Sequence, residues 1–183
     1  MPVSSIPHYQ KEFHDQVHKV LGRRDLKLTD LPELPFIEAF IQETLRHNPL
    51  APTIQHCTLK DVRIREFFLP AEQHIQVNAY VINHDEKYFP DPYKFNPYRW
   101  IDADGKFRSD LVDKMMTFGQ GRRSCIGRPL ARMEMLICLV KLVQNFELSV
   151  PEGQILANIE VEGGSVTAVP PPYLVKFAPR AII

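Results

Sequence analysis

Cysteine is scarce in this sequence, and the three residues that occur are scattered. They stand at positions 57, 125 and 138 of 183, and no Cys-x-x-Cys pair is present. An odd number of widely spaced cysteines argues against a disulfide framework and against a zinc ribbon. The cysteine content therefore suits a reducing compartment.

The sequence also lacks an excess of either charge. Lys plus Arg and Asp plus Glu each total 22, so the formal net charge is zero. A neutral chain gives no global electrostatic argument for a nucleic acid or for an acidic partner. We expect no nucleic-acid partner, and any binding through charge must come from local patches.

Long uninterrupted hydrophobic runs are missing too. The most apolar stretch, residues 130–146, is broken by Arg132, Glu134, Lys141 and Gln144, which predicts a buried helix of a soluble protein rather than a membrane span. The first residues have neither a basic segment nor a long apolar stretch, so we expect no signal peptide and no membrane anchor there. A length of 183 residues suits one domain but not two ordinary ones.

Apolar residues recur at helical spacing in three places. The pattern predicts helices over residues 8–21, 35–47 and 130–146. Gly22 is placed to end the first helix, Pro35 to begin the second, and Asn48 with Pro49 to end it.

Short β-type runs separate the second and third predicted helices. They predict a small antiparallel sheet with strands near residues 53–58, 62–64 and 75–81. Two further β-type pieces, at 147–150 and 172–177, flank a Gly163-Gly164 turn. Residues 83–117 are irregular but rich in Tyr, Phe and Pro, so we expect an ordered, packed loop there. The fold class is α+β.

The segment with the most chemical character is Phe-Gly-Gln-Gly-Arg-Arg-Ser-Cys-Ile-Gly, residues 118–127. Its cysteine, Cys125, follows a glycine-rich basic turn and precedes a predicted helix. The helix dipole, the backbone N–H groups of the turn and the nearby arginines all favour a thiolate, which would be a nucleophile or a metal ligand. The alternative is a buried free cysteine ahead of a core helix.

The spacing Phe118-x-x-Gly121-x-Arg123-x-Cys125-x-Gly127 resembles the signature of the cytochrome P450 superfamily of haem-thiolate monooxygenases. The resemblance implies that Cys125 is the axial ligand of the iron of haem b. It also implies that Gly121 and Gly127 let the backbone approach the porphyrin, that Phe118 packs beside the sulfur, and that Arg123 binds a haem propionate.

Two other motifs extend this resemblance. Glu43-x-x-Arg46, about eighty residues ahead of the cysteine, and Arg99 match a structural lock of the family on the proximal side of the haem. Tyr98 stands where an acid is common, so we expect the polar network around Arg99 to be weaker or rearranged, yet completed in some way. Taken alone, Glu43 and Arg46 would be a solvated surface pair.

The resemblance assigns two further roles. His56 would hydrogen-bond a haem propionate, although a strand histidine facing solvent or satisfied in the core is the alternative. A basic proximal face for an acidic electron donor would consist of Lys114, Arg122, Arg128 and Arg132. Ordinary solvated charge is the alternative for these four side chains.

The resemblance covers residues 7–177 and implies a C-terminal fragment of the P450 fold, a single partial domain over residues 1–183, of the microsomal eukaryotic type. The parent protein would insert one oxygen atom from O2 into a small hydrophobic substrate, with electrons from an NADPH–cytochrome reductase flavoprotein. It would lie on the cytosolic face of the endoplasmic reticulum membrane, held only by an N-terminal anchor missing from this chain. The family's distal helix would precede Met1, so we expect this chain alone not to turn over.

Two rival functions belong to other classes. His14 and His18 have the i, i+4 spacing of a zinc-protease helix, with Asp15 in place of the usual base Glu, which would suit a zinc hydrolase. A non-catalytic remnant that binds a redox partner without haem is the other rival, and it predicts salt-sensitive association.

Overall fold

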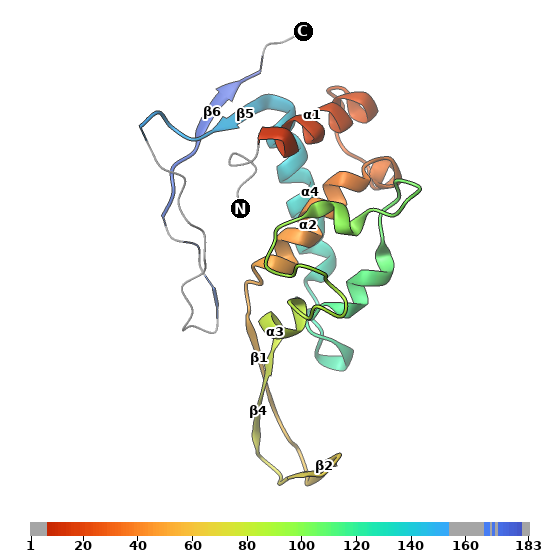
Figure 1. Cartoon of the computed structure of the whole chain (residues 1–183), viewed down its shortest axis with the longest axis vertical. Helices are drawn as coiled ribbons and strands as arrows, with labels where there is room; N and C mark the ends of the chain where they lie inside the picture. The colour runs from red at the N-terminus through yellow and green to blue at the C-terminus, as the bar shows by residue number, and fades with distance from the viewer. Residues whose placement is uncertain (1–6, 154–166, 169, 171, 181–183) are drawn as a thin grey trace.

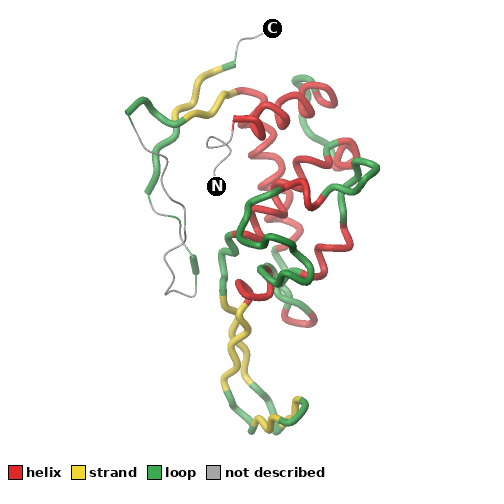
Figure 2. The backbone as a smooth tube through the Cα atoms, viewed as in Figure 1, coloured by secondary structure: helices red, strands yellow, loops and turns green. Residues whose placement is uncertain are grey.

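The computed structural model describes residues 7–153, 167–168, 170 and 172–180. Three helices, α1 (Pro7–Leu21), α2 (Pro35–His47) and α4 (Arg128–Asn145), pack on one another to form a helical body. A β-ribbon extends from one end of this body, and a second pair of strands lies at the other end (Figures 1 and 2). This mixed arrangement with small antiparallel sheets agrees with the predicted α+β class.

The first two helices begin and end where the sequence predicts. The N–H of Gly22 bonds to the carbonyl of His18 at 3.0 Å, and Gly22 has φ +58°, the left-handed conformation that glycine adopts most readily. Pro35 occupies the first turn of α2, and the N–H of Asn48 bonds to the Thr44 carbonyl at the other end. Local sequence signals therefore set these boundaries.

Aromatic side chains hold α1 against α2. Phe13 and Phe40 meet edge to face with ring centroids 5.2 Å apart, and Phe13 meets Phe36 in the same way at 5.6 Å. Phe95 joins this core from the long loop, 5.4 Å from Phe40. The loop is thus packed on the helical body at its middle.

Helix α4 is buried on one face. Leu136, Val140 and Val143 are in the core, whereas Leu130 is 61% exposed and Ile137 44% exposed. The prediction of a buried helix is therefore wrong for the second face, because within the described residues no element covers that side.

The β-ribbon consists of two successive antiparallel pairs. Strand β1 (Thr53–Cys57) pairs with β4 (His74–Asn78), with Gln55 opposite Gln76. Beyond them, β2 (Val62–Ile64) pairs with β3 (Phe67–Leu69), a strand that the sequence did not predict.

The prediction that a strand continues to residue 81 is wrong. Residues Ala79–Asn83 form the short helix α3, because the side chain of Asn78 accepts a hydrogen bond from the N–H of Val81 at 3.0 Å and caps the helix.

At the other end of the body, β5 (Phe146–Ser149) pairs antiparallel with β6 (Lys176–Pro179). The second strand starts later than predicted, since residues 172–175 are irregular. Gln10 of α1 ties β5 to the body: its amide bonds to the N–H and to the carbonyl of Leu148. The predicted Gly163-Gly164 turn lies outside the described residues.

The long loop is ordered by 3-10 turns, η3 (Pro97–Trp100) and η4 (Ser109–Lys114). Phe89 and Trp100 are fully buried and pack with Leu111 and Met115 against Ala39 of α2. The prediction of an ordered, packed loop is confirmed. Across the described ranges, no helix is both long and apolar enough to cross a membrane.

Candidate functional site

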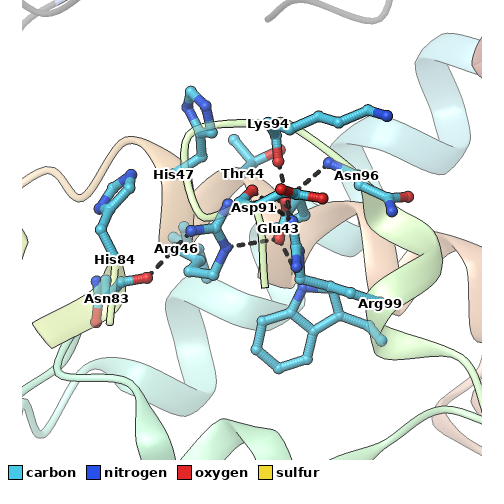
Figure 3. Close-up of polar contacts among 12 residues, drawn as sticks. Glu43, Thr44, Arg46, His47, Asn83, His84, Asp91, Lys94, Asn96 and Arg99 are labelled. Carbon is cyan, nitrogen blue, oxygen red and sulfur yellow. Dashed lines mark hydrogen bonds and ion pairs between the residues drawn. The ribbon is translucent and has the colours of Figure 1, made fainter. Parts of the chain in front are cut away.

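A buried carboxylate, Glu43, lies at the centre of the contact between α2 and the long loop (Figure 3). Arg46, also fully buried, donates from Nε to Oε2 of Glu43 at 2.8 Å and from Nη2 to Oε1 at 2.9 Å. This is the bidentate geometry that makes guanidinium–carboxylate pairs strong and directional. The indole N–H of Trp100 donates to Oε2 at 2.9 Å.

The loop supplies two further donors to Glu43. The backbone N–H of Asn96 lies 2.8 Å from Oε1, and Nε of Arg99 lies 3.1 Å from the same oxygen. The remaining nitrogens of Arg99 donate to the carbonyls of Pro90, Asp91 and Lys94 at 2.7, 3.2 and 3.0 Å. The structure thus brings Glu43, Arg46 and Arg99 together, and Arg99 closes the loop on itself.

These contacts set the protonation state of Glu43. Burial by itself would raise the pKa of this carboxyl, but the hydrogen bonds and charges of Arg46, the N–H of Asn96 and the charge of Arg99 outweigh it and hold the pKa below its ordinary value. Glu43 is therefore a carboxylate at neutral pH.

Tyr98 takes no part in this network. Its hydroxyl donates to the carboxylate of Glu12 on α1, and burial together with that carboxylate raises the pKa of the phenol. Arg99 donates to three backbone carbonyls instead of to an acid at position 98. The network is therefore rearranged, but Arg99 does not lack acceptors.

Cys125 lies in a loop between η5 (Gly121–Arg123) and α4, and its side chain is exposed. Its backbone N–H bonds to the carbonyl of Phe118 at 2.8 Å, and its carbonyl accepts from the N–H of Arg128 at 3.3 Å. The exposed sulfur rules out the reading of Cys125 as a buried core cysteine. Arg123 is exposed on the same loop.

Two of the loop's glycines adopt the left-handed conformation. Gly119 has φ +69° and Gly121 has φ +70°, which any other residue would adopt only with strain. Gly127 has an ordinary φ of −80°, but a Cβ on it would lie 3.8 Å from the Cys125 sulfur. A side chain at 127 would therefore occupy the space beside the thiol.

The surroundings of the sulfur fit a flat apolar ligand with carboxylates. Ile126, the next residue, is fully exposed, and Leu130 at the start of α4 is largely exposed, so apolar side chains close to Cys125 in the sequence are accessible. A thiol, apolar surface and the Arg123 guanidinium are the groups that a haem with its propionates would require.

His56 is not part of this cluster. It lies on β1 opposite Ile75, its side chain is exposed, and no hydrogen bond or ion pair among the described residues joins it to residues 118–127.

The four basic residues of the expected proximal face differ in their surroundings. Arg132 pairs with Glu38 of α2 at 3.0 Å, and burial raises the pKa of Glu38 in spite of this arginine. Lys114 lies over the ring of Tyr88, 5.6 Å from its centroid. Arg128 and Arg132 line an open recess together with Phe118 and Gly119. Arg122 is exposed.

His14 and His18 stack on one face of α1, with ring centroids 5.8 Å apart. Among the residues described, no group of three or more His, Cys, Asp or Glu side chains is placed to hold a metal ion. A zinc hydrolase needs at least three protein ligands, so this geometry does not support one.

Sequence reasoning missed Trp100, Asn96 and Asn83 as partners of the lock. Trp100 is the single tryptophan and directly follows Arg99, which is a usable signal. Asn96 contributes its backbone N–H and Asn83 its carbonyl, and backbone groups leave no mark in a sequence.

Comparison with known proteins gives a consistent picture. A family model described as Cytochrome P450 matches residues 4–177. Cytochrome P450 1A1 from Canis lupus familiaris is 42% identical over 149 residues, which are 80% of this chain and 28% of that protein. Cytochrome P450 1A2 from Homo sapiens is 41% identical over 150 residues, 80% of this chain and 29% of that protein. The chain thus spans less than a third of the length of these relatives. With the matching region covering nearly the whole sequence, the chain belongs to the cytochrome P450 family.

Proposed function

We propose that this chain forms the thiolate side of a haem-thiolate monooxygenase, as one partial domain over residues 1–183, with Cys125 as the axial ligand of the iron of haem b. The observation that carries the proposal is the exposed sulfur of Cys125 in a loop of defined backbone. Cysteines that bind metals or react lie in accessible, electropositive surroundings, and the exposed sulfur on the same loop as Arg123 fits that description.

The haem, when bound, supplies activation of O2, and a thiolate ligand assists by donating electron density that favours O–O cleavage. The residues of this chain hold and orient the group. Gly127 leaves space beside the sulfur, Phe118 anchors the Cys125 N–H, and Gly121 allows the turn that precedes it.

Two residues are proposed to bind the haem propionates. Arg123 has a planar guanidinium, which matches a carboxylate with two parallel hydrogen bonds. His56 would be the second, and it requires the β1 strand to lie beside the haem edge. The propionate of a bound haem would then bridge the helical body and the β-ribbon.

The role that we propose for Glu43, Arg46 and Arg99 is structural. A carboxylate with five donors fixes α2 against the long loop. The cysteine loop, residues 118–127, begins directly after the long loop ends. The lock therefore supports the ligand without contacting it.

For the whole protein we propose insertion of one oxygen atom into a small hydrophobic substrate. Electrons would come from an NADPH–cytochrome reductase flavoprotein that docks on the basic residues 114, 122, 128 and 132. The protein would act on the cytosolic face of the endoplasmic reticulum membrane. This chain by itself is proposed not to turn over.

The test is spectroscopic. The purified chain is loaded with haem, reduced and exposed to carbon monoxide, and the thiolate-type Soret band is recorded. We expect this band in the wild-type chain and its loss in Cys125→Ser, while Cys57→Ser and Cys138→Ser keep it as matched controls. A wild-type chain that binds haem without this band contradicts the proposal. Product formation with NADPH and the reductase would contradict the proposed inactivity.

A further inference from the structure

Asn83, the last residue of α3, is completely buried, and three of its polar groups form hydrogen bonds. Its main-chain carbonyl accepts from Nη1 of Arg46 at 3.1 Å, where Figure 3 shows Arg46 reaching from Glu43 to Asn83. Its side-chain Oδ1 accepts from the N–H of Met116 at 2.8 Å, and its Nδ2 donates to the hydroxyl of Thr117 at 3.3 Å. One residue thus joins the lock to the segment just before the cysteine loop.

The contacts continue from that segment to the sulfur-bearing residue. The hydroxyl of Thr117 donates to the carbonyl of Leu45 on α2 at 3.3 Å. The next residue, Phe118, accepts the N–H of Cys125 at 2.8 Å. An uninterrupted path of hydrogen bonds and peptide links therefore runs from Arg46 through Asn83 and Thr117 to Cys125.

Few other polar contacts fix the start of the loop. The amide of Gln120 donates to the carbonyls of Asp113 and Met115 at 3.1 and 3.5 Å, but Gln120 is exposed. Exposed hydrogen bonds compete with water and constrain the chain weakly, whereas a buried N–H that loses its partner is costly. Asn83 itself is completely buried, and its bonds to residues 116 and 117 are part-buried, so they are the stronger constraint on that segment.

We propose that Asn83 is a positioning residue, which holds the start of the cysteine loop at a fixed place relative to the Glu43–Arg46 lock. It touches neither the sulfur nor the lock carboxylate. The effect of Asn83 on thiolate ligation rests on the proposed function. Its effect on the order of the cysteine loop does not.

The haem-free arm of the test measures amide hydrogen exchange along the full chain. Asn83→Leu replaces the amide by an apolar group of similar size, and Thr117→Val removes one hydroxyl. Each variant loses two part-buried hydrogen bonds. Both should therefore speed exchange at the Cys125 N–H at least about tenfold, the factor that corresponds to the net loss of one hydrogen bond. Thr117→Ser should restore the slow rate, and Asn145→Leu, an exposed matched change, should leave it unaltered.

Exchange in α2 separates positioning from general destabilisation. The N–H of Phe40 should exchange at the wild-type rate in all of these variants. The proposal is overturned if the exchange rates of the Phe40 and Cys125 N–H groups rise equally, or if the rate at Cys125 does not rise. If Asn83→Leu fails to fold, Thr117→Val and its Ser rescue decide the outcome.

The haem-bound arm measures the share of bound haem that gives the thiolate-type band. We expect this share to fall in Asn83→Leu and Thr117→Val and to recover in Thr117→Ser. If the wild-type chain shows the band and the share of haem that gives it is unchanged in the two variants, the proposal is overturned. If the wild-type chain binds haem without the band, the proposed function is wrong. If the two variants still show faster amide exchange in the loop, the positioning role of Asn83 is nevertheless supported.

Discussion

The lock around Glu43 and the loop around Cys125 are built in opposite ways. Glu43 and Arg46 are completely buried, and their charged atoms are matched with donors or acceptors from α2, α3 and the long loop. Cys125 and Ile126 are exposed, and two glycines in the left-handed conformation shape the chain before them. The chain thus concentrates its buried polar contacts around Glu43 and leaves the Cys125 sulfur accessible.

This difference predicts that stability and ligand chemistry can be separated by mutation. Changes in the lock should unfold the chain, and changes at the sulfur should abolish ligation with little effect on folding.

Glu43→Ala should give the greatest loss of stability. Removal of this carboxylate leaves the Arg46 charge buried and the Trp100 indole N–H without an acceptor. Breaking a buried pair in this way costs about 3–5 kcal/mol in the free energy of unfolding. Urea unfolding followed by the fluorescence of Trp100, the single tryptophan, measures it.

Asp110→Ala is the matched control for that variant. It breaks the exposed Arg108–Asp110 pair, so the expected change is below about 1 kcal/mol. Equal losses for Glu43→Ala and Asp110→Ala would remove the distinction between a buried lock and an ordinary surface pair.

Gly121→Ala should lower stability by about 1–2 kcal/mol, because alanine is strained at φ +70° while no neighbouring atom blocks its Cβ. Gly105→Ala, at φ +78° and also in open space, should cost about as much. Only the change at Gly121 should reduce the thiolate-type band, since Gly105 lies in another turn. A similar reduction by both variants would show that strain acts through general stability.

The fold was predictable from sequence where local signals decide it. Gly22, Pro35 and Asn48 set helix boundaries through backbone conformation and missing donors, and each boundary agrees with the structure. The end of β4 was not predictable in this way, because residues 79–81 have strand-like side chains and the cap of Asn78 overrides them.

The polar contacts of the site show a similar division. The motif residues Glu43, Arg46 and Arg99 could be picked out from their spacing. Their partners could not, because the N–H of Asn96 and the carbonyl of Asn83 are backbone groups brought close by tertiary packing. The exposed face of α4 was missed because a sequence pattern records apolarity but not what covers it.

A pH titration should show a smaller effect beside the lock. Burial lowers the pKa of His84, and the nearby Arg46 charge adds to it, although the hydrogen bond to the Tyr80 carbonyl opposes the shift. The folded chain therefore favours the neutral imidazole of His84. The unfolded chain then binds the proton more readily, and stability should fall as the pH drops below about 6.5.

His84→Gln should reduce this loss of stability between pH 7.5 and pH 5.5, since glutamine does not titrate and still can donate to the Tyr80 carbonyl. His56→Gln, at an exposed strand position, is the control and should leave the pH dependence as in wild type. Stability measured by urea unfolding at each pH gives the answer, and an unchanged slope in His84→Gln would assign the pH dependence to another group.

The smallest effect on stability is expected for Cys125→Ser, the change with the greatest effect on ligation. A substitution at an exposed position alters the free energy of unfolding by about 0.5 kcal/mol or less. The most direct single measurement is therefore the reduced carbon monoxide spectrum of haem-loaded wild type beside Cys125→Ser. We expect a thiolate-type band in the wild type and none in the equally stable variant. A band that survives Cys125→Ser, or a wild-type chain that holds haem without the band, would show that Cys125 is not the ligand.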